Sequence, residues 1–187
     1  MGHSVYAHDL AESLALVLPH SSKDDSRRIL YAIRYTVLAG EVSLAATDSY
    51  SLVEDVIAVQ EGSESESVIL DRGDAERLMK AAKVSGKSGI ARVVVEIVDG
   101  KARFDLADQQ FNFQGVEGQY PAIENLWPQG EPEAVARIGI NPAQLARWKG
   151  LGEKSMVLTF YGEQKPILVE SVVRAGYRSM MMPVRLA

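Results

Sequence analysis

Lysine and arginine side chains gather on two segments of the chain whose apolar spacing is typical of amphipathic helices. Residues 71–87 carry five basic and three acidic side chains, and residues 141–154 carry three basic and one acidic side chain. Both segments are therefore positive, although the whole chain has a formal net charge of −5. Fixed cations attract the phosphates of a nucleic acid without reading its bases. The net negative charge argues against a simple DNA-coating protein, but it leaves room for a protein whose basic side chains gather on one face; the alternative of an ordinary solvated helix face also stays open.

The residues that most often carry catalysis or bind metals form no recognisable arrangement. The histidines, His3, His8 and His20, match neither the spacing of a metal-ligand set nor that of a nucleophile–base pair. Asp48 follows Ala-Thr as in an aspartic protease loop, but Ser49 stands where that loop needs glycine, and the sequence has no second loop of this kind. Cysteine and a glycine-rich phosphate loop are also missing from the sequence. We therefore expect a protein that is not an enzyme and needs no metal or cofactor.

The composition indicates a folded protein without membrane segments. Of its 187 residues, 47% are hydrophobic, which is enough for a buried core. Apolar runs stay shorter than the ~20 residues of a membrane-spanning helix, and the N-terminus lacks the pattern of a signal peptide. We expect a cytoplasmic protein.

The hydrophobic periodicity predicts the same order of elements three times: a short strand, a helix and then further strands. The first copy has a strand at 4–7, a helix at 9–18 and strands at 31–38, 42–47 and 52–59. The second has a strand at 67–70, a helix capped by Asp71 and strands at 93–98, 102–106 and 111–116. The third has a strand at 135–140, a helix that begins at Asn141-Pro142 and strands at 156–161, 167–173 and 178–184. Asparagine before proline is a strong helix start, because it caps the first turn and proline suits the first helical position.

Two polar breaks divide these copies into domains. The acidic stretch 61–67 separates the first two copies, and the proline- and glycine-containing stretch 127–133 precedes the third. We expect one complete domain at 1–128, built from units at about 1–61 and 67–118, then a linker at 129–134 and a single unit at 135–187. The pattern alone leaves open an unrelated α+β domain.

Four segments of the sequence resemble the bacterial sliding clamp family, which is the beta subunit of DNA polymerase III. They are 44–53 with Ala-Thr-Asp, 116–123 with Val-Glu-Gly-Gln-Tyr-Pro, 138–141 with Ile-Gly-Ile-Asn, and 182–186 with Met-Pro-Val-Arg-Leu. The resemblance implies an α+β DNA-clamp fold with three βαβββ units, helices lining the pore and sheets outside. Family clamps have three domains of two units each, and this chain resembles the middle domain followed by the second half of the last.

The resemblance also implies a function and a set of partners. Clamps of this family encircle double-stranded DNA and tether the replicative polymerase and the clamp loader through a hydrophobic pocket for linear motifs. The pocket residues implied here are Thr47, Ser49, Tyr50, Ser51, Leu52, Pro121, Asn125, Leu126, Met182, Pro183, Val184, Arg185 and Leu186. The side chains expected to face DNA are Lys23, Arg27, Arg28, Arg72, Arg77, Lys80, Lys83, Lys87, Arg147, Lys149 and Lys154. The setting would be a bacterial cell or a phage-infected host.

A ring around DNA sets the number of chains. Helices spaced ~10 Å apart leave a hole of radius ~9 Å when nine of them line it, and ~14 Å when twelve do. Duplex DNA has a radius of ~10 Å, consistent with its groove depths. Twelve units therefore fit, which predicts a homotetramer of three-unit chains. The alternative is a clamp-like regulator that forms no ring and sequesters clamp-binding motifs.

Overall fold

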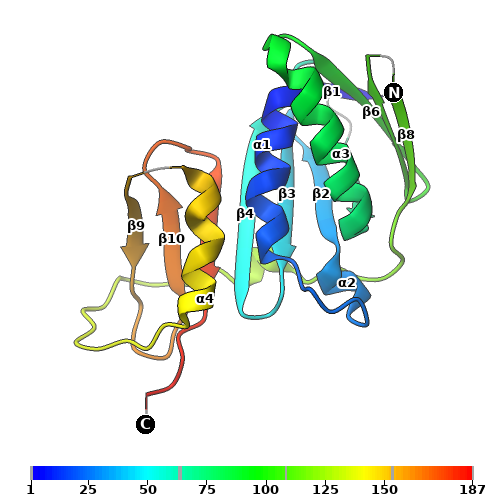
Figure 1. Ribbon diagram of the computed structural model, residues 1–187. Helices are drawn as coiled ribbons and strands as arrows, with labels where there is room; N and C mark the ends of the chain where they lie inside the picture. The colour runs from blue at the N-terminus through cyan, green and yellow to red at the C-terminus, as the bar shows by residue number, and fades with distance from the viewer. Residues whose placement is uncertain (1, 63–64, 108, 153, 187) are drawn as a thin grey trace.

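The computed structural model describes residues 2–62, 65–107, 109–152 and 154–186. Within these ranges the chain forms one antiparallel sheet of four strands and one of seven, with the main helices packed on one side of the strands (Figure 1). The first unit comprises β1 (His3–Tyr6), α1 (Ala7–Val17), η1 (Leu18–His20), α2 (Arg28–Tyr31), β2 (Ile33–Leu38), β3 (Glu41–Thr47) and β4 (Ser51–Ala58). The second comprises β5 (Glu66–Leu70), α3 (Arg72–Ser85), η2 (Gly86–Ser88), β6 (Arg92–Val98), β7 (Lys101–Leu106) and β8 (Gln109–Gln114). After η3 (Ile123–Asn125), the third comprises α4 (Pro142–Leu145), η4 (Ala146–Leu151), β9 (Met156–Thr159), β10 (Ile167–Ser171) and β11 (Tyr177–Met181).

The first two units are joined by an exchange of their leading strands. Strand β1 pairs with β6 of the second unit, and β5 pairs with β2 of the first, so that neither leading strand lies in the sheet of its own unit. The helices α1 and α3 lie side by side against these sheets (Figure 1). The chain also passes close to α1 just after α3 ends, since a Cβ added at Gly86 of η2 would lie 2.7 Å from the backbone nitrogen of His8. Leu10 and Leu14 of α1 and Leu78 of α3 are fully buried in the resulting core.

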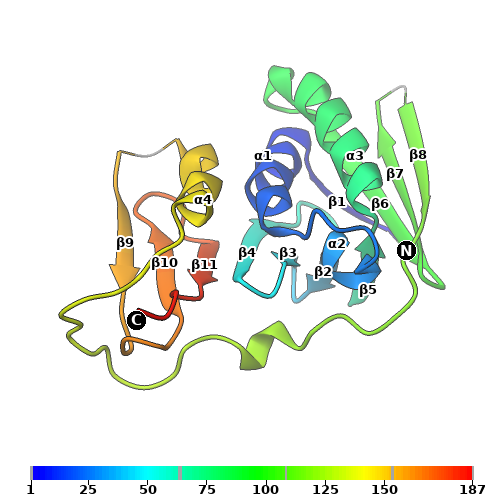
Figure 2. The ribbon, with the colours of Figure 1, turned by 60° about the horizontal axis from the view of Figure 1, so that its bottom comes forward.

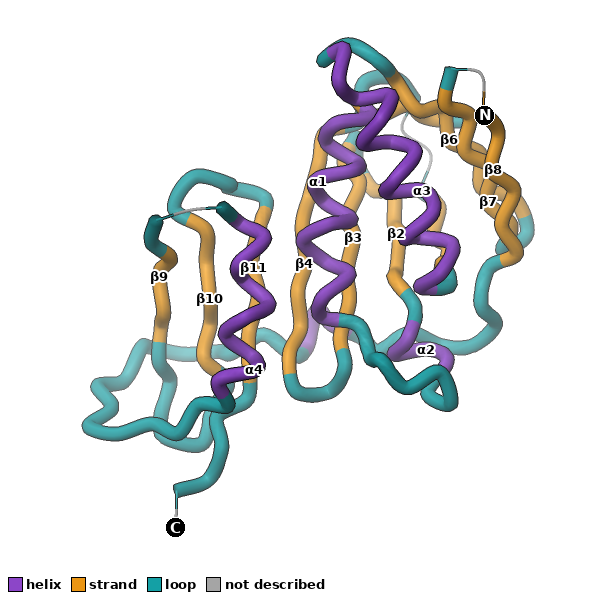
Figure 3. The backbone as a smooth tube through the Cα atoms, in the orientation of Figure 1, coloured by secondary structure: helices purple, strands orange, loops and turns teal. Residues whose placement is uncertain are grey.

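The third unit continues the sheet of the first. Strand β11 pairs antiparallel with β4, which gives the order β5-β2-β3-β4-β11-β10-β9 (Figure 3). An ion pair reinforces this junction, because the Arg174 guanidinium donates to both carboxylate oxygens of the buried Asp55, at 2.8 and 2.9 Å. The third helix begins as expected: the side chain of Asn141 accepts a hydrogen bond from Ala143 N at 3.0 Å. It is α-helical for one turn only and then continues as the 3-10 helix η4.

One predicted element is wrong. The leading strand expected at 135–140 is not formed, so the third unit is not a complete βαβββ unit; the segment makes a single bridge, between Gly139 and Val184. Its alternating apolar residues suit a strand, but a strand also needs a partner edge. In the first domain that edge comes from the other unit, and the described residues contain no fourth unit. A smaller difference lies in the first unit, where Tyr31 ends the helix α2 and the strand begins at Ile33.

A second apolar layer covers the opposite face of the seven-stranded sheet. The segment after β8 crosses this face, with η3 on the side away from α1 and α3 (Figure 2). Its Tyr120, Ile123 and Trp127 pack on residues of β3, β4 and β11 in a cluster separate from the main core. Among the described residues, helices long and apolar enough to cross a membrane are absent.

Candidate partner-binding site

The turn between β3 and β4 is held in shape by the carboxylate of Asp48. Its Oδ1 accepts hydrogen bonds from the backbone nitrogens of Tyr50 at 2.9 Å and Ser51 at 2.8 Å. Thr47 closes the turn by donating its hydroxyl to Ser51 O at 2.7 Å. Ser49 has a φ of 80°, and its hydroxyl accepts a hydrogen bond from Arg27 at 2.6 Å. The turn is therefore rigid, and the Tyr50 side chain at its tip is 62% exposed.

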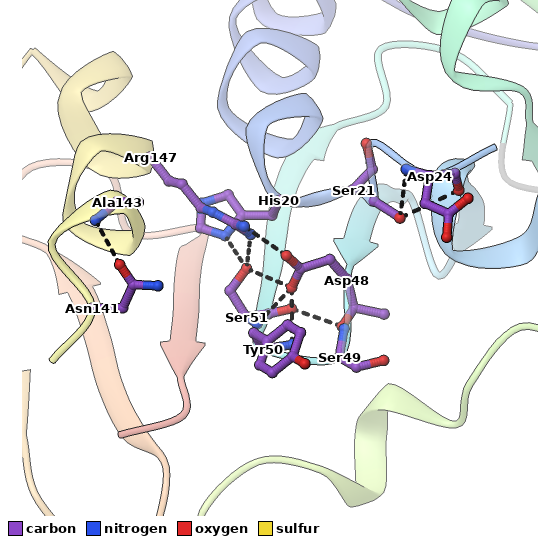
Figure 4. Close-up of polar contacts among 12 residues, drawn as sticks. His20, Ser21, Asp24, Asp48, Ser49, Tyr50, Ser51, Asn141, Ala143 and Arg147 are labelled. Atoms are coloured by element: carbon purple, nitrogen blue, oxygen red, sulfur yellow. Dashed lines mark hydrogen bonds and ion pairs between the residues drawn. The ribbon is translucent and has the colours of Figure 1, made fainter. Parts of the chain in front are cut away.

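Arg147 of η4 joins this turn to the third unit (Figure 4). Its guanidinium donates to Asp48 Oδ2 at 2.6 Å and also to the hydroxyl of Ser51. The two side chains of the ion pair are only 18% and 12% exposed. Burial acts to raise the pKa of Asp48, but the hydrogen bond from Arg147 and the two backbone N–H groups outweigh it and hold that pKa below its usual range.

His20 lies beneath the same turn. Its Nδ1 is 3.2 Å from the hydroxyl of Ser51, and its ring meets that of Trp148 edge-on at 5.3 Å. The side chain is fully buried. Burial, aided by the charge of Arg147 and opposed by that of Asp48, lowers the pKa of His20 to about 3. The imidazole is therefore neutral at physiological pH, and it packs against the turn as a structural group.

The strands next to the turn carry the second apolar layer. Leu52 of β4 is 1% exposed and pairs across the sheet with Met180 of β11. Both pack against Ile123 and Trp127. The guanidinium of Arg178 lies 4.2 Å from the centre of the Trp127 ring, which keeps this indole in place over the β4–β11 junction.

The segment after β11 returns to the turn. Met182 N donates to Tyr50 O at 2.8 Å, and Val184 N donates to Gly139 O at 2.9 Å. A Cβ added at Gly139 would lie 2.6 Å from Val184 O and 2.9 Å from Cδ2 of Leu186, so the tail needs glycine at this position. The turn and the tail therefore form one continuous surface.

The structure divides the predicted pocket residues by exposure. Tyr50, Leu126, Met182, Val184 and Leu186 are large apolar side chains that are 40–62% exposed. Ser49, Asn125 and Arg185 are also exposed, and Pro121 and Pro183 are half-buried. Thr47, Ser51 and Leu52 are buried, so they support the surface from below. Whether the exposed set binds a peptide stays a prediction.

The predicted DNA-facing residues also fall into groups. Arg72 is engaged with Glu76 at 3.0 Å and with Leu18 O at 2.9 Å, Arg77 pairs with Asp74, and Arg27 and Arg147 are held at the turn. The lysines Lys80, Lys83 and Lys87 are exposed along and after α3. Lys23, Arg28, Lys149 and Lys154 are exposed too. Whether any of these side chains faces DNA stays a prediction.

Sequence reasoning missed three residues of this site: Arg147 as a partner of Asp48, Trp127 as a packing residue, and His20. Trp127 lies at the start of a stretch rich in proline and glycine, which suggested a linker. A tryptophan in such a stretch is itself a signal, because its large apolar surface favours burial. Asp48 and Arg147 are 99 positions apart, and no local pattern joins them.

No family model matches the chain. A curated relative, the beta sliding clamp of Micrococcus luteus, is 27% identical over 124 residues, which are 65% of this chain and 39% of the relative. Solved structures match along the whole chain. The match to a putative DNA polymerase III beta subunit from Eubacterium rectale covers 100% of this chain and 66% of that one, with a TM-score of 0.85 and 10% identity.

The sliding clamp of Pseudomonas aeruginosa, solved bound to griselimycin, matches with a TM-score of 0.84 and 15% identity over 100% of this chain and 66% of that one. The chain has the fold of the bacterial sliding clamp. The predicted α+β clamp fold is thereby confirmed. The clamp fold is present here in shortened form, since the chain spans less than half of the curated relative and about two thirds of the solved clamp chains.

Proposed function

We propose that this chain is a subunit of a DNA sliding clamp, which encircles duplex DNA and tethers replication proteins through the surface around Tyr50 and Met182. One observation carries the proposal: α1, α3 and the α4–η4 helix lie on the same side of a sheet that runs unbroken through the β4–β11 junction (Figure 1). A sheet extended in this way can form the outer wall of a ring whose inner wall is helical.

The charges on the helical side suit a sliding protein. Lys80 and Lys83 on α3 and Lys87 in η2 are exposed, and among the described residues they take part in no ion pair. Free ammonium groups attract phosphate oxygens in any sequence, and each neutralised phosphate releases counterions. Such contacts hold the protein near DNA without fixing it at one base sequence, because they carry no sequence information.

The surface around the β3–β4 turn suits a peptide partner. Exposed apolar side chains from three separate segments gather on a rigid support, with Met182 as an adaptable thioether among them. Griselimycin, which is bound in the P. aeruginosa clamp structure, offers a direct probe. We expect it to bind this chain, and we expect Met182→Glu to abolish binding while leaving the fold intact, because Met182 is 40% exposed.

Retention on closed circular DNA tests the ring. A clamp loaded on a nicked circular plasmid should survive gel filtration in high salt and should be released when the plasmid is linearised. The double variant Lys80→Glu, Lys83→Glu should lose retention and keep griselimycin binding. Lys101→Glu, a single charge reversal on β7 of the four-stranded sheet, is the control away from the helices and should behave as wild type. Equal retention on linear and circular DNA would show that the DNA does not pass through a closed ring.

The second candidate is a clamp-like regulator that stays outside a ring and captures clamp-binding motifs. It would use the same apolar surface, so griselimycin binding does not separate the two. It is favoured if the protein binds griselimycin, remains a monomer at every concentration and is never retained on circular DNA.

A further inference from the structure

We propose that two copies of this chain complete each other by exchanging residues Arg137–Ile140, each of which would form the strand next to β9 of its partner. This interface goes beyond the proposed function, because it concerns how the unpaired third unit is covered whether or not the protein surrounds DNA.

The three leading segments occupy equivalent places in their units. In each unit one residue, three positions before the helix begins, contacts the chain just after the unit's own last strand. Ser4 bridges to Glu61, Val116 N donates to Ile69 O at 2.8 Å, and Val184 N donates to Gly139 O at 2.9 Å. The helices that follow begin at Ala7, Arg72 and Pro142. Gly139 is therefore the counterpart of Ser4 and Ile69.

Each leading segment has a second edge, which is paired in the first two units and, among the described residues, unpaired in the third. Strand β1 pairs with β6, the first sheet strand of the other unit, and β5 pairs with β2 in the same way. By this rule Arg137–Ile140 would pair with the first strand of a unit related to its own. Its own β9 is out of reach, since Gly139 is held beside the end of β11 and the strands run in the order β11-β10-β9. A second copy of the chain supplies a β9 that is free.

A row of paired residues across the seven-stranded sheet fixes the register. It runs from Ile69 through Arg34, Ala45 and Glu54 of the first unit, and then through Arg178 and Glu170 to Val157. The Glu54–Arg178 pair joins the last strands of the two units. Arg34 lies two strands from Glu54 on one side, and Val157 lies two strands from Arg178 on the other, so Val157 is the counterpart of Arg34. Ile69 pairs with Arg34, and hence Gly139 of one copy should lie opposite Val157 of the other. Ile138 then lies opposite Leu158, and Ile140 opposite Met156.

The exposure of β9 agrees with a missing neighbour. The inward-facing residues of the paired strands, Ile33 and Tyr35 in β2 and Val93 and Val95 in β6, are all fully buried. Their counterparts in β9 are Met156, which is 36% exposed, and Leu158, which is half-buried. Met156 borders a groove of about 270 Å³ together with Leu145, Trp148 and Leu151, on the flank where α1 has α3. Strand β9 also carries no charge, whereas natural edge strands are commonly protected by charged side chains.

A two-fold axis relates the two copies, because each gives and receives the same strand. The pair would then consist of a complete domain, a composite domain made from two third units, and a second complete domain. This two-fold axis runs through the plane of the sheet, from its helical side to its outer side. The two-fold axis that relates the first two units has the same direction relative to the sheet. In a ring, the Tyr50–Met182 surfaces of the two copies would therefore open on opposite faces.

Cysteine cross-linking tests the exchange, and the chain has no cysteine of its own. In the proposed register Arg137 lies opposite Thr159 of the partner. Because Gly139 is the counterpart of Ser4, Arg137 corresponds to position 2 of the β1–β6 ladder. In that ladder Ala7 N donates to Ala91 O at 2.8 Å, so the odd-numbered positions form hydrogen-bonded pairs. The even-numbered positions form the non-hydrogen-bonded pairs, whose Cα atoms lie closer together. Such narrow pairs suit a disulfide. On oxidation the double variant Arg137→Cys, Thr159→Cys should become a covalent dimer with twice the 20.4 kDa mass of one chain.

The single variants should stay monomeric on denaturing gels, and an equimolar mixture of them should give the same dimer. A disulfide within one chain, or no dimer from either the double variant or the mixture, would overturn the exchange. The native mass of the wild type shows whether the exchanged dimer exists alone or as part of a tetrameric ring. A cross-linked dimer that is not retained on circular DNA removes the proposed function and leaves the interface. Retention without the cross-link removes the interface alone.

Discussion

Replacing Arg147 with methionine removes the contact that ties the β3–β4 turn to the third unit. The guanidinium pairs with Asp48 at 2.6 Å between side chains that are 18% and 12% exposed. Exposed ion pairs contribute up to about 1 kcal/mol, and breaking a fully buried pair costs about 3–5 kcal/mol. Asp48 keeps two backbone N–H donors after the change, which limits the penalty. We therefore expect a loss of about 2 kcal/mol in the free energy of unfolding.

Urea unfolding at pH 7 measures this loss, as a fall of about 1 M in the midpoint for a slope of about 2 kcal/mol/M. A double-mutant cycle with Asp48→Asn isolates the pair, because the asparagine oxygen can still accept the hydrogen bonds of the turn. We expect a coupling energy above about 1 kcal/mol. Arg77→Met is the control, since that side chain is 65% exposed and should contribute below about 0.5 kcal/mol.

The dependence on pH gives an independent check of the same contact. The pKa of Asp48 is lowered in the folded state, so its stabilising effect is present above the unfolded pKa of about 3.9 and is lost as the pH falls through the folded value. The difference between wild type and Arg147→Met should therefore shrink in acid. An equal difference at pH 7 and pH 3, or no coupling in the cycle, would refute the reasoning.

Three further changes test neighbouring parts of the site. Burial lowers the pKa of His20 to about 3, so the unfolded chain binds a proton first as the pH falls through about 6.5, and stability should fall by about 2 kcal/mol between pH 7 and 5; His20→Gln should remove this part of the slope in urea titrations. Trp127→Ala should cost about 3 kcal/mol in urea unfolding, because a 7% exposed indole leaves the outer cluster, and a loss below about 1 kcal/mol would place Trp127 in a linker after all. Gly139→Ala drives a Cβ against Val184 O at 2.6 Å and should weaken griselimycin binding measured by calorimetry; Gly150→Ala, where the nearest atom is 3.7 Å away, should leave the affinity unchanged.

Elements whose signals are local could be predicted from the sequence. The α3 helix begins after Asp71, whose side chain accepts from Gly73 N at 2.8 Å, as its N-cap position predicts. The β6–β7 hairpin turns at Asp99-Gly100, and both residues have positive φ values, 50° and 72°, as the Asp-Gly pair predicts. In each case a few adjacent residues contain the whole physical cause.

Features that depend on distant residues could not be predicted in this way. The charge of Arg147 suggested a phosphate contact. In the structure its guanidinium donates to the carboxylate of Asp48, which is 99 positions away in the sequence, so no local pattern indicates the pair. Leu52 was expected in the pocket because of the family resemblance, and the structure buries it beside the β3–β4 turn. Its burial under Trp127 and Ile123 depends on how the segment after β8 crosses the sheet, which periodicity does not encode.

The failure of the strand at 135–140 has the most general cause. Its alternation is as regular as that of β1, but pairing in this fold occurs between units and not within them. A unit's leading strand is held beside its own last strand, at the far side of the sheet from its own first strand. Units of this kind are therefore stable in pairs, and a third unit leaves one strand and one edge unsatisfied. Unpaired β9, with Met156 and Val157 exposed and no charge to protect it, is a surface that must be covered or will associate. Association through Arg137–Ile140 satisfies both needs with residues the chain already contains, and it makes an odd number of units compatible with a closed, even-numbered ring.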